Sequence, residues 1–191
     1  MSRRNKVNFS LRDTSNIDKP SDEEIAKILR AADMIIDVAG RNALVKILKG
    51  SKDKKILEYK FDECPSYGYY NHLKMTDIKV IVDWMIENGY LDISYNGRLP
   101  MIIFSDYGWE LYKPIFAKEV LDKLITVPDE NIEELAEYLR TINRQVINII
   151  LEWIVEKDLK ELIPFLRKWV KTAYKKDAQN IRKTISKLSE K

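Results

Sequence analysis

The stretch that decides the fold runs from Gly40 to Gly108, and it contains the loop Lys49-Gly50-Ser51-Lys52-Asp53-Lys54-Lys55. A short apolar helix over residues 43–48 runs into Gly50, which can adopt a left-handed conformation and so predicts the end of that helix. Ser51 is expected to cap the next helix and to leave its first amide groups free. Amides at a helix start bind anions, and the lysines raise the local positive potential. The loop therefore predicts a phosphate-binding site.

After this loop the pattern predicts a helix and then a β-hairpin. Thr76 is a candidate cap for a helix whose apolar residues follow 3.6-residue spacing up to Gly89. Two apolar runs, 90–95 and 100–104, flank the pair Asn96-Gly97, which is the strongest short-range signal for a hairpin turn. A helix, a short helix, a third helix and a hairpin in this order are typical of a winged helix.

In their order and spacing these residues resemble the RQC domain, which follows the helicase core of RecQ enzymes. The motifs that carry the resemblance lie between residues 21 and 116: Ile47-Leu48-Lys49-Gly50-Ser51, Lys55-Ile56, Ser66-Tyr67-Gly68, the run from Ile81 to Leu91, and Phe104-Ser105-Asp106-Tyr107-Gly108. The resemblance implies a winged helix that binds DNA, with Lys49, Ser51 and Lys55 at loop positions that grip the backbone. As a whole, the chain resembles a stand-alone, minor-type RQC protein without a helicase core.

The composition indicates a globular, heavily charged protein. Of 191 residues, 45% are hydrophobic and 33% are charged. The single cysteine, Cys64, excludes an internal disulfide and a Cys-rich zinc site. Residues 1–4 have no apolar segment behind them, and no apolar run is long enough to cross a bilayer. These features predict a cytoplasmic protein, nucleoid-associated if bacterial, without a membrane partner.

The net charge of +3 conceals strongly segregated blocks. Bases outnumber acids in residues 1–12, 41–60 and 160–191, whereas acids dominate residues 13–40. Separated blocks of this kind produce local potentials that the net charge hides. A solvated face without a partner is the alternative for each block, but the three basic blocks together favour a nucleic-acid ligand.

The sequence predicts three parts and a mainly α fold with a small antiparallel β wing. Residues 1–20 are expected to form a flexible basic arm with Phe9 as its candidate anchor. Residues 21–126 form the winged helix, whose first helix begins with a capping box at Ser21 and runs to Gly40. Pro and Asp in Val127-Pro128-Asp129 indicate a boundary, after which residues 127–191 are predicted to form an antiparallel helical bundle.

The helix over residues 76–88 would be the recognition helix of a standard helix-turn-helix protein. Its outward face is expected to hold three acids, Asp77, Asp83 and Glu87, against the single base Lys79. Because acids are repelled by the phosphates that border a groove, insertion of this helix is not expected.

The predicted wing is short. Arg98 can reach a phosphate or a minor groove, and Tyr95 or Leu99 could wedge against a terminal base pair. The alternative is a plain hairpin whose Tyr95 covers the core. Among the other aromatics, Tyr67 is expected in the core, whereas Tyr69 and Tyr70 are expected to be open to a sugar or base.

Near the C-terminus a second basic surface is predicted. Lys168, Lys171 and Lys175 are spaced three and four residues apart and would share one helix face. This face is either a second phosphate-binding surface or a solvated face of a bundle that docks a helicase.

No enzyme motif is found in the sequence. It lacks a Gly-x-x-x-x-Gly-Lys-Ser/Thr phosphate loop, a nucleophile elbow and His-Glu-x-x-His, and it has one histidine, His72. We therefore predict no catalytic residue, no metal and no cofactor.

The leading hypothesis is a non-catalytic module that grips double-stranded or branched DNA through phosphates, with a helicase or other DNA-processing protein as a further candidate partner. A sequence-specific transcriptional regulator and a winged-helix protein-docking module are the alternatives. The candidate DNA contacts are Arg41, Lys49, Gly50, Ser51, Lys52, Lys54, Lys55, Tyr69, Tyr95, Arg98 and Leu99.

Overall fold

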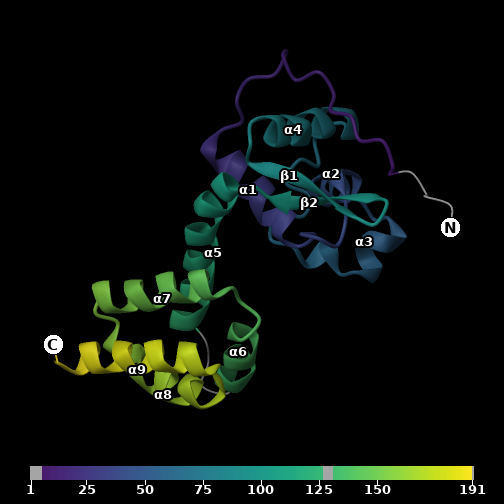
Figure 1. Ribbon diagram of the computed structural model, residues 1–191. Coiled ribbons are helices and arrows are strands. Elements are labelled where there is room, and N and C mark those ends of the chain that lie inside the picture. The colour runs from purple at the N-terminus through teal and green to yellow at the C-terminus, as the bar shows by residue number, and fades with distance from the viewer. Residues whose placement is uncertain (1–5, 127–130, 191) are drawn as a thin grey trace. The chain divides into compact units, whose positions relative to one another are not determined.

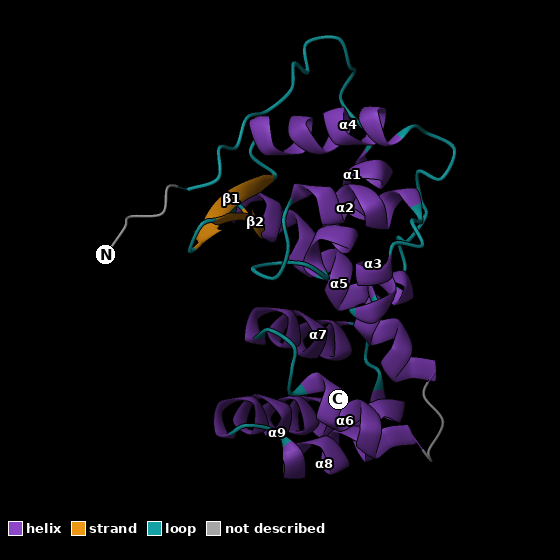
Figure 2. Ribbon diagram, turned by 90° about the vertical axis from the view of Figure 1, so that its right-hand side faces the viewer, coloured by secondary structure: helices purple, strands orange, loops and turns teal. Residues whose placement is uncertain are grey.

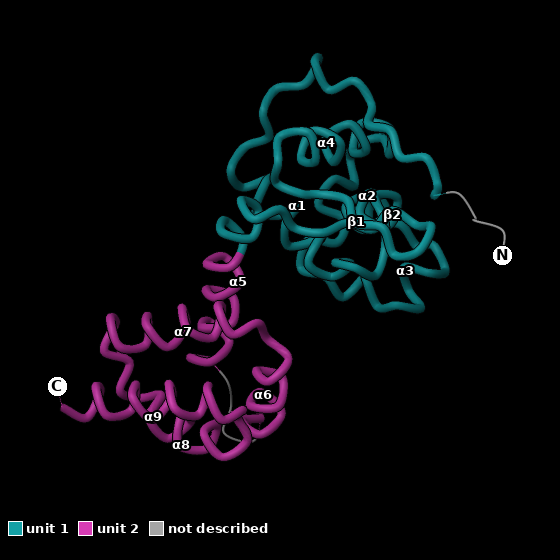
Figure 3. Tube along the Cα trace, viewed as in Figure 1, with its two compact units in different colours: residues 1–112 teal, residues 113–191 magenta. Residues whose placement is uncertain are grey.

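The computed structural model describes residues 6–126 and 131–190. Contacts divide the chain into two compact units, residues 1–112 and 113–191 (Figure 3). This division falls within one helix, α5 (Asp106–Thr126), which contributes to both units. The boundary segment predicted at residues 127–129 lies outside the described residues, so a boundary at residue 126 stays a prediction.

The first unit contains the winged helix that the sequence predicts. Its elements in chain order are α1 (Asp22–Asp33), α2 (Arg41–Lys49), α3 (Lys54–Glu58), the 3-10 helix η1 (Phe61–Glu63), α4 (Met75–Glu87), β1 (Leu91–Asn96) and β2 (Leu99–Phe104). Helix α2 packs against both α1 and α4, while β1 contacts α4 and β2 contacts α1 and α2 (Figure 1). The apolar faces meet in one core, whose fully buried side chains include Ile28, Leu44, Ile47, Ile78, Met85 and Ile102.

The first helix starts as predicted but ends earlier. The Ser21 side chain accepts from the Glu24 N–H, and the Glu24 carboxylate accepts from the Ser21 N–H at 2.8 Å, which completes the capping box. Helix α1 ends at Asp33 instead of Gly40, because residues 37–39 pair with the outer edge of β2. Asp37 N–H donates to the Ile102 carbonyl at 3.1 Å, and Ile102 N–H donates to the Ala39 carbonyl at 3.0 Å. This pairing satisfies strand-edge groups that a longer helix would leave open.

The hairpin forms, but its turn is one residue later than predicted. Asn96 pairs with Leu99 across the antiparallel strands, so the two-residue loop is Gly97–Arg98 instead of Asn96–Gly97. Gly97 has φ 59° and supplies the left-handed conformation that such a turn requires. Figure 2 shows this hairpin in orange against the purple helices. The predicted cap of α4 also shifts, because the helix begins at Met75 and Thr76 lies inside its first turn.

Residues 6–20 form no helix or strand and attach to the winged helix at several points. Phe9 is the anchor that the sequence suggested: the Arg41 guanidinium lies 4.5 Å from its ring centroid. Before it, Val7 N–H donates to the Arg98 carbonyl at 3.0 Å. After it, the Thr14 hydroxyl donates to a carboxylate of α4. The predicted flexible arm is therefore attached over residues 7–14, and its residues 1–5 lie outside the described residues.

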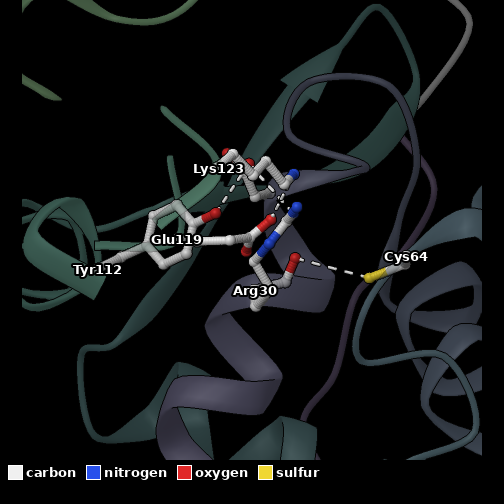
Figure 4. A network of polar contacts seen from close by, with 6 residues as sticks. Arg30, Cys64, Tyr112, Glu119 and Lys123 are labelled. Atoms are coloured by element: carbon white, nitrogen blue, oxygen red, sulfur yellow. Dashed lines mark hydrogen bonds and ion pairs between the residues drawn. The ribbon is translucent and has the colours of Figure 1, made fainter. Parts of the chain in front are cut away.

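Polar contacts fix α1 within the first unit (Figure 4). The buried Cys64 thiol lies 3.8 Å from the Arg30 carbonyl oxygen. Tyr112 is fully buried, and its hydroxyl donates to the Asp33 carboxylate at 2.9 Å. Both contacts involve the last turn of α1 and hold it against Cys64 and Tyr112.

The second unit is the predicted helical bundle. Besides the second part of α5, it contains α6 (Ile132–Leu139), α7 (Arg144–Glu156), the 3-10 helix η3 (Lys160–Leu162), α8 (Ile163–Thr172) and α9 (Lys175–Glu190). Helix α9 packs against α7 and α8, and α6 packs against α8. Side chains of the core include Val146, Ile150, Ile154, Leu166, Trp169 and Ile181. Within residues 6–126 and 131–190, no helix is long and apolar enough to cross a membrane.

Candidate nucleic-acid interface

The loop between α2 and α3 is held in place by the segment Ser66-Tyr67-Gly68. Gly50 ends α2 with φ 74°, and a Cβ there would lie 3.0 Å from the Gly68 Cα, so the two backbones are in close contact. Gly68 N–H donates to the Ile47 carbonyl at 2.9 Å, and the Tyr67 hydroxyl donates to the Ser51 carbonyl at 3.0 Å. The loop therefore has a defined shape, and Gly50 and Ser51 contribute backbone geometry to it.

The lysines of this region divide into bound and exposed groups. Lys49 Nζ donates to the backbone carbonyls of Asn71 at 2.5 Å and Leu73 at 2.8 Å, so it ties the loop to the start of α4. The side chains of Lys52, Lys54 and Lys55 are exposed. These three, rather than Lys49, present their ammonium groups to solvent, and we call them the lysine loop.

The helix start after the loop differs from the predicted anion cradle. Asp53, and not Ser51, caps α3: its carboxylate accepts from the Lys55 N–H at 3.0 Å. The same carboxylate lies 2.8 Å from Lys46 Nζ, and these hydrogen bonds keep the Asp53 pKa below its ordinary value. Because a carboxylate of the protein already occupies this helix start, phosphate binding there would depend on the lysine side chains instead.

The wing residues lie close to the N-terminal arm. The Tyr95 hydroxyl donates to the Val7 carbonyl at 3.3 Å, and Lys6 Nζ lies 4.5 Å from the Tyr95 ring centroid. Tyr95 is therefore a half-buried support for the arm, and neither the core cover nor the free wedge that the sequence suggested. Arg98 is exposed at the turn, and Leu99 is 55% exposed beside it.

The lysine loop and the wing border one groove. Its volume is about 510 Å³, and its lining includes Lys55, Phe9, Leu99, Pro100 and the start of α2. Gly40 lies at the base, where an added Cβ would meet the Pro100 carbonyl oxygen at 2.5 Å. The structure thus brings Lys55 and Leu99, which are 44 positions apart in the chain, to the same hollow.

Two predicted contacts are held by other protein groups, although Arg41 also lines the groove described above. Arg41 is directed inward: its guanidinium lies 2.5 Å from Asp83 Oδ1 and donates to the Ser10 carbonyl at 2.9 Å. Tyr69 packs edge-on against Tyr70, and burial together with the neighbouring acids Glu23 and Glu24 raises its pKa. Arg41 is already paired with a carboxylate, and the acids beside Tyr69 disfavour a phosphate. We therefore do not keep either side chain as a proposed DNA contact.

Tyr70 also differs from the sequence prediction. It was expected to be open, but it is 2% exposed and its hydroxyl donates to Glu24 at 3.0 Å. Burial and this carboxylate raise the Tyr70 pKa well above its usual range.

The acidic face expected on α4 loses one of its three acids. Asp83 is fully buried against Arg41, and the Glu87 carboxylate accepts from the Thr14 hydroxyl. Asp77 and Glu87 remain exposed acids without a basic partner in the described contacts. The burial of Asp83 therefore weakens the argument against contact by this helix, but two of its three acids still support it. Sequence reasoning missed the Arg41–Asp83 pair because the two residues are 42 positions apart and belong to different helices.

The C-terminal basic surface also changes. Lys168 and Lys171 are exposed on α8, but Lys175 begins α9, after the chain turns at Ala173 and Tyr174. The three lysines therefore do not share one helix face. A separate groove of about 420 Å³ lies between α7 and α9, where Glu152 and Glu156 face Lys183 and Lys187.

In the part of the chain that the structure describes, no group of three or more His, Cys, Asp or Glu side chains could hold a metal ion. In the first unit, the charged side chains near backbone carbonyls are lysine and arginine, for example Lys49 and Arg41.

Comparisons with known proteins agree with the fold of the first unit. A family model described as the RQC domain matches residues 21–120. The chain is 27% identical to the ATP-dependent DNA helicase RecQ of Bacillus subtilis over 110 residues, which is 56% of this chain and 18% of the helicase. It thus spans less than one fifth of that relative. No solved structure matches the chain.

Proposed function

The chain belongs to the RQC domain family, and on that premise we propose that it is a non-catalytic protein that grips double-stranded or branched DNA through backbone phosphates. The lysine loop and Arg98 supply the main contacts, and Leu99 lies where the duplex meets the wing. Such a role would place the protein with cellular DNA, in the cytoplasm and on the nucleoid of a bacterium. A helicase or another DNA-processing protein is the partner class that fits the RecQ relative.

The observation that carries this proposal is the exposure of Lys52, Lys54 and Lys55 on a loop of fixed shape. Neighbouring lysines are held by Asp53 or by carbonyls, whereas these three are exposed, and Lys55 lines the same groove as Leu99 of the wing. A loop whose backbone is already ordered loses less freedom on binding, and phosphates that replace the counterions of its lysines add affinity.

Two alternatives make different demands on the same surface. A sequence-specific regulator would need side chains that read base edges, and a docking module would bind protein with weak dependence on DNA.

The test is binding of the full chain to blunt duplex, forked duplex, four-way junction and single strand at two salt concentrations. We expect tight, salt-dependent binding to duplex forms without a strong sequence preference. A large preference for one sequence would favour the regulator, and absence of binding to every form would exclude the proposal.

Arg98→Ala is expected to weaken duplex binding by about 1.5–3 kcal/mol, the range for a hydrogen bond to a charged group. Competition with random duplex at fixed salt measures this loss.

The wing is expected to position DNA without unwinding it, since its loop has only two residues. Opening of a short fluorescent fork at stoichiometric protein, lost in Leu99→Ala, would contradict this limited role.

Neutralising the C-terminal cations tests the second surface. Lys168→Gln with Lys171→Gln is expected to flatten the salt dependence by about 0.9 per lost phosphate contact if α8 touches DNA. We favour that outcome because both side chains are exposed and point away from the buried residues Leu166 and Trp169. An unchanged slope would assign α8 to a solvated face of the bundle.

A further inference from the structure

A basic groove lies between α2 and the first half of α4. Its volume is about 320 Å³, and it is lined by three cations from three different segments: Arg12 of the arm, Lys46 of α2 and Lys79 of α4. Asn42 and Thr76 add polar side chains to the lining. No carboxylate within residues 6–126 or 131–190 lines it.

The charges in this groove are unequally compensated. Lys46 is paired with Asp53, and Arg41 below the groove is paired with Asp83. The Arg12 guanidinium has only the Thr76 carbonyl, at 3.4 Å, as its described side-chain contact. Burial, and then the positive charges of Arg41 and Arg12, lower the pKa of Lys79, while Asp83 acts in the opposite direction. A cation held close to other cations is stabilised by an anion that enters from outside.

The N-terminal arm completes this groove. Arg12 N–H donates to Asp83 Oδ2 at 3.0 Å, and Thr14 is attached to α4 through Glu87. These contacts hold the backbone and leave the Arg12 side chain directed along α4. Residues 6–20 precede the family match, which begins at residue 21, so Arg12 lies outside the matched region.

The groove is also continuous with the lysine loop. Lys46 lines the groove, and its Nζ is bonded to Asp53, which stands between Lys52 and Lys54 of the loop. A nucleic-acid backbone on the loop therefore passes close to the groove. A linear polyanion matches this strip better than a single small anion, because successive phosphates can meet successive cations.

We propose that this groove binds a backbone phosphate of the same DNA that contacts the lysine loop, with Arg12 and Lys79 as the ligands and Asn42 and Thr76 as hydrogen-bonding neighbours. The proposal rests on the function proposed above. It assigns α4 and the arm to the DNA footprint through a backbone phosphate, whereas the sequence argued only against insertion of this helix into a groove.

The test uses the full chain and a random duplex of about twenty base pairs, with affinity measured over a range of salt. Arg12→Gln and Lys79→Gln are each expected to weaken binding and to flatten the slope of log K against log salt by about 0.9. Arg12→Gln keeps the N–H that holds the arm. Lys19→Gln is the matched control, since it removes one charge from the same arm at an exposed site outside the groove.

A second readout follows the Lys79 ammonium by NMR. The Lys79 pKa is expected to rise when the duplex binds, because a phosphate offsets the repulsion from Arg12 and Arg41. A purely structural role for Lys79 would leave it unchanged. Urea unfolding of each variant checks that the fold is kept.

The outcomes separate this inference from the proposed function. If the unaltered protein binds duplex but both groove variants keep its full slope, the groove is not a phosphate site and the proposed function stands. If the unaltered protein binds no duplex, both fail. If the variants lose binding to polyglutamate while duplex binding is unchanged, the groove takes an acidic protein segment and the inference is wrong.

Discussion

Replacing Lys52, Lys54 and Lys55 together by Gln is expected to produce the largest loss of duplex affinity of any change to this protein. The three ammonium groups are exposed on a loop whose backbone is fixed by Gly68 and Tyr67. Each phosphate contact that is lost flattens the slope of log K against log salt by about 0.9, so three contacts would flatten it by up to about 2.7. Fluorescence anisotropy with blunt duplex over a series of salt concentrations measures both the affinity and the slope.

The control for this variant must remove the same charge from another surface. Lys19, Lys60 and Lys118 are exposed, and each already faces a carboxylate, of Asp22, Glu63 and Asp122 respectively. Changing these three to Gln should alter the slope much less, because paired surface lysines have fewer counterions to release. If both triple variants lose affinity equally, the effect comes from net charge, and the lysine loop is not a defined site.

Local patterns in the sequence predicted the elements of the first unit. Gly50 ends α2 and the apolar spacing of residues 78–86 produces α4, because both signals act within a few residues of the structure they cause. The end of α1 could not be predicted in the same way. It depends on hydrogen bonds from residues 37–39 to Ile102, more than sixty positions later in the chain.

The sequence predicted that the candidate site is a basic loop, but it could not predict which of the loop's lysine side chains are exposed. Lys49 and Lys52 look equivalent in the sequence. Only the fold brings the carbonyls of Asn71 and Leu73 to Lys49 and leaves Lys52 exposed. The same holds for Asp83, whose position on α4 suggested an outward acid. Its burial follows from an arginine on another helix, and no periodicity of one helix encodes that.

Asp83→Ala is expected to lower the free energy of unfolding by about 3–5 kcal/mol, because breaking a buried ion pair leaves its partner charge uncompensated. Asp83 is fully buried, while Arg41 keeps 13% of its side chain exposed. Both Asp83 oxygens are used: Oδ1 meets Arg41, and Oδ2 accepts from the Arg12 N–H. Removal of this carboxylate should therefore loosen the arm as well as the α2–α4 contact. Urea unfolding followed by circular dichroism measures the loss.

Three further variants decide whether the loss comes from the ion pair. Asp77→Ala removes an exposed acid from the same helix and should cost less than about 1 kcal/mol, the scale of a helix-dipole contact. The double change Arg41→Met with Asp83→Leu should cost less than the sum of the single changes Arg41→Ala and Asp83→Ala, because it leaves no charge stranded in the core. If Asp83→Ala unfolds at the same urea concentration as Asp77→Ala, the pair contributes nothing measurable. The arm would then be held by its other contacts, such as those of Val7, Phe9 and Thr14, and the position of Arg12 beside Lys79 would need another cause.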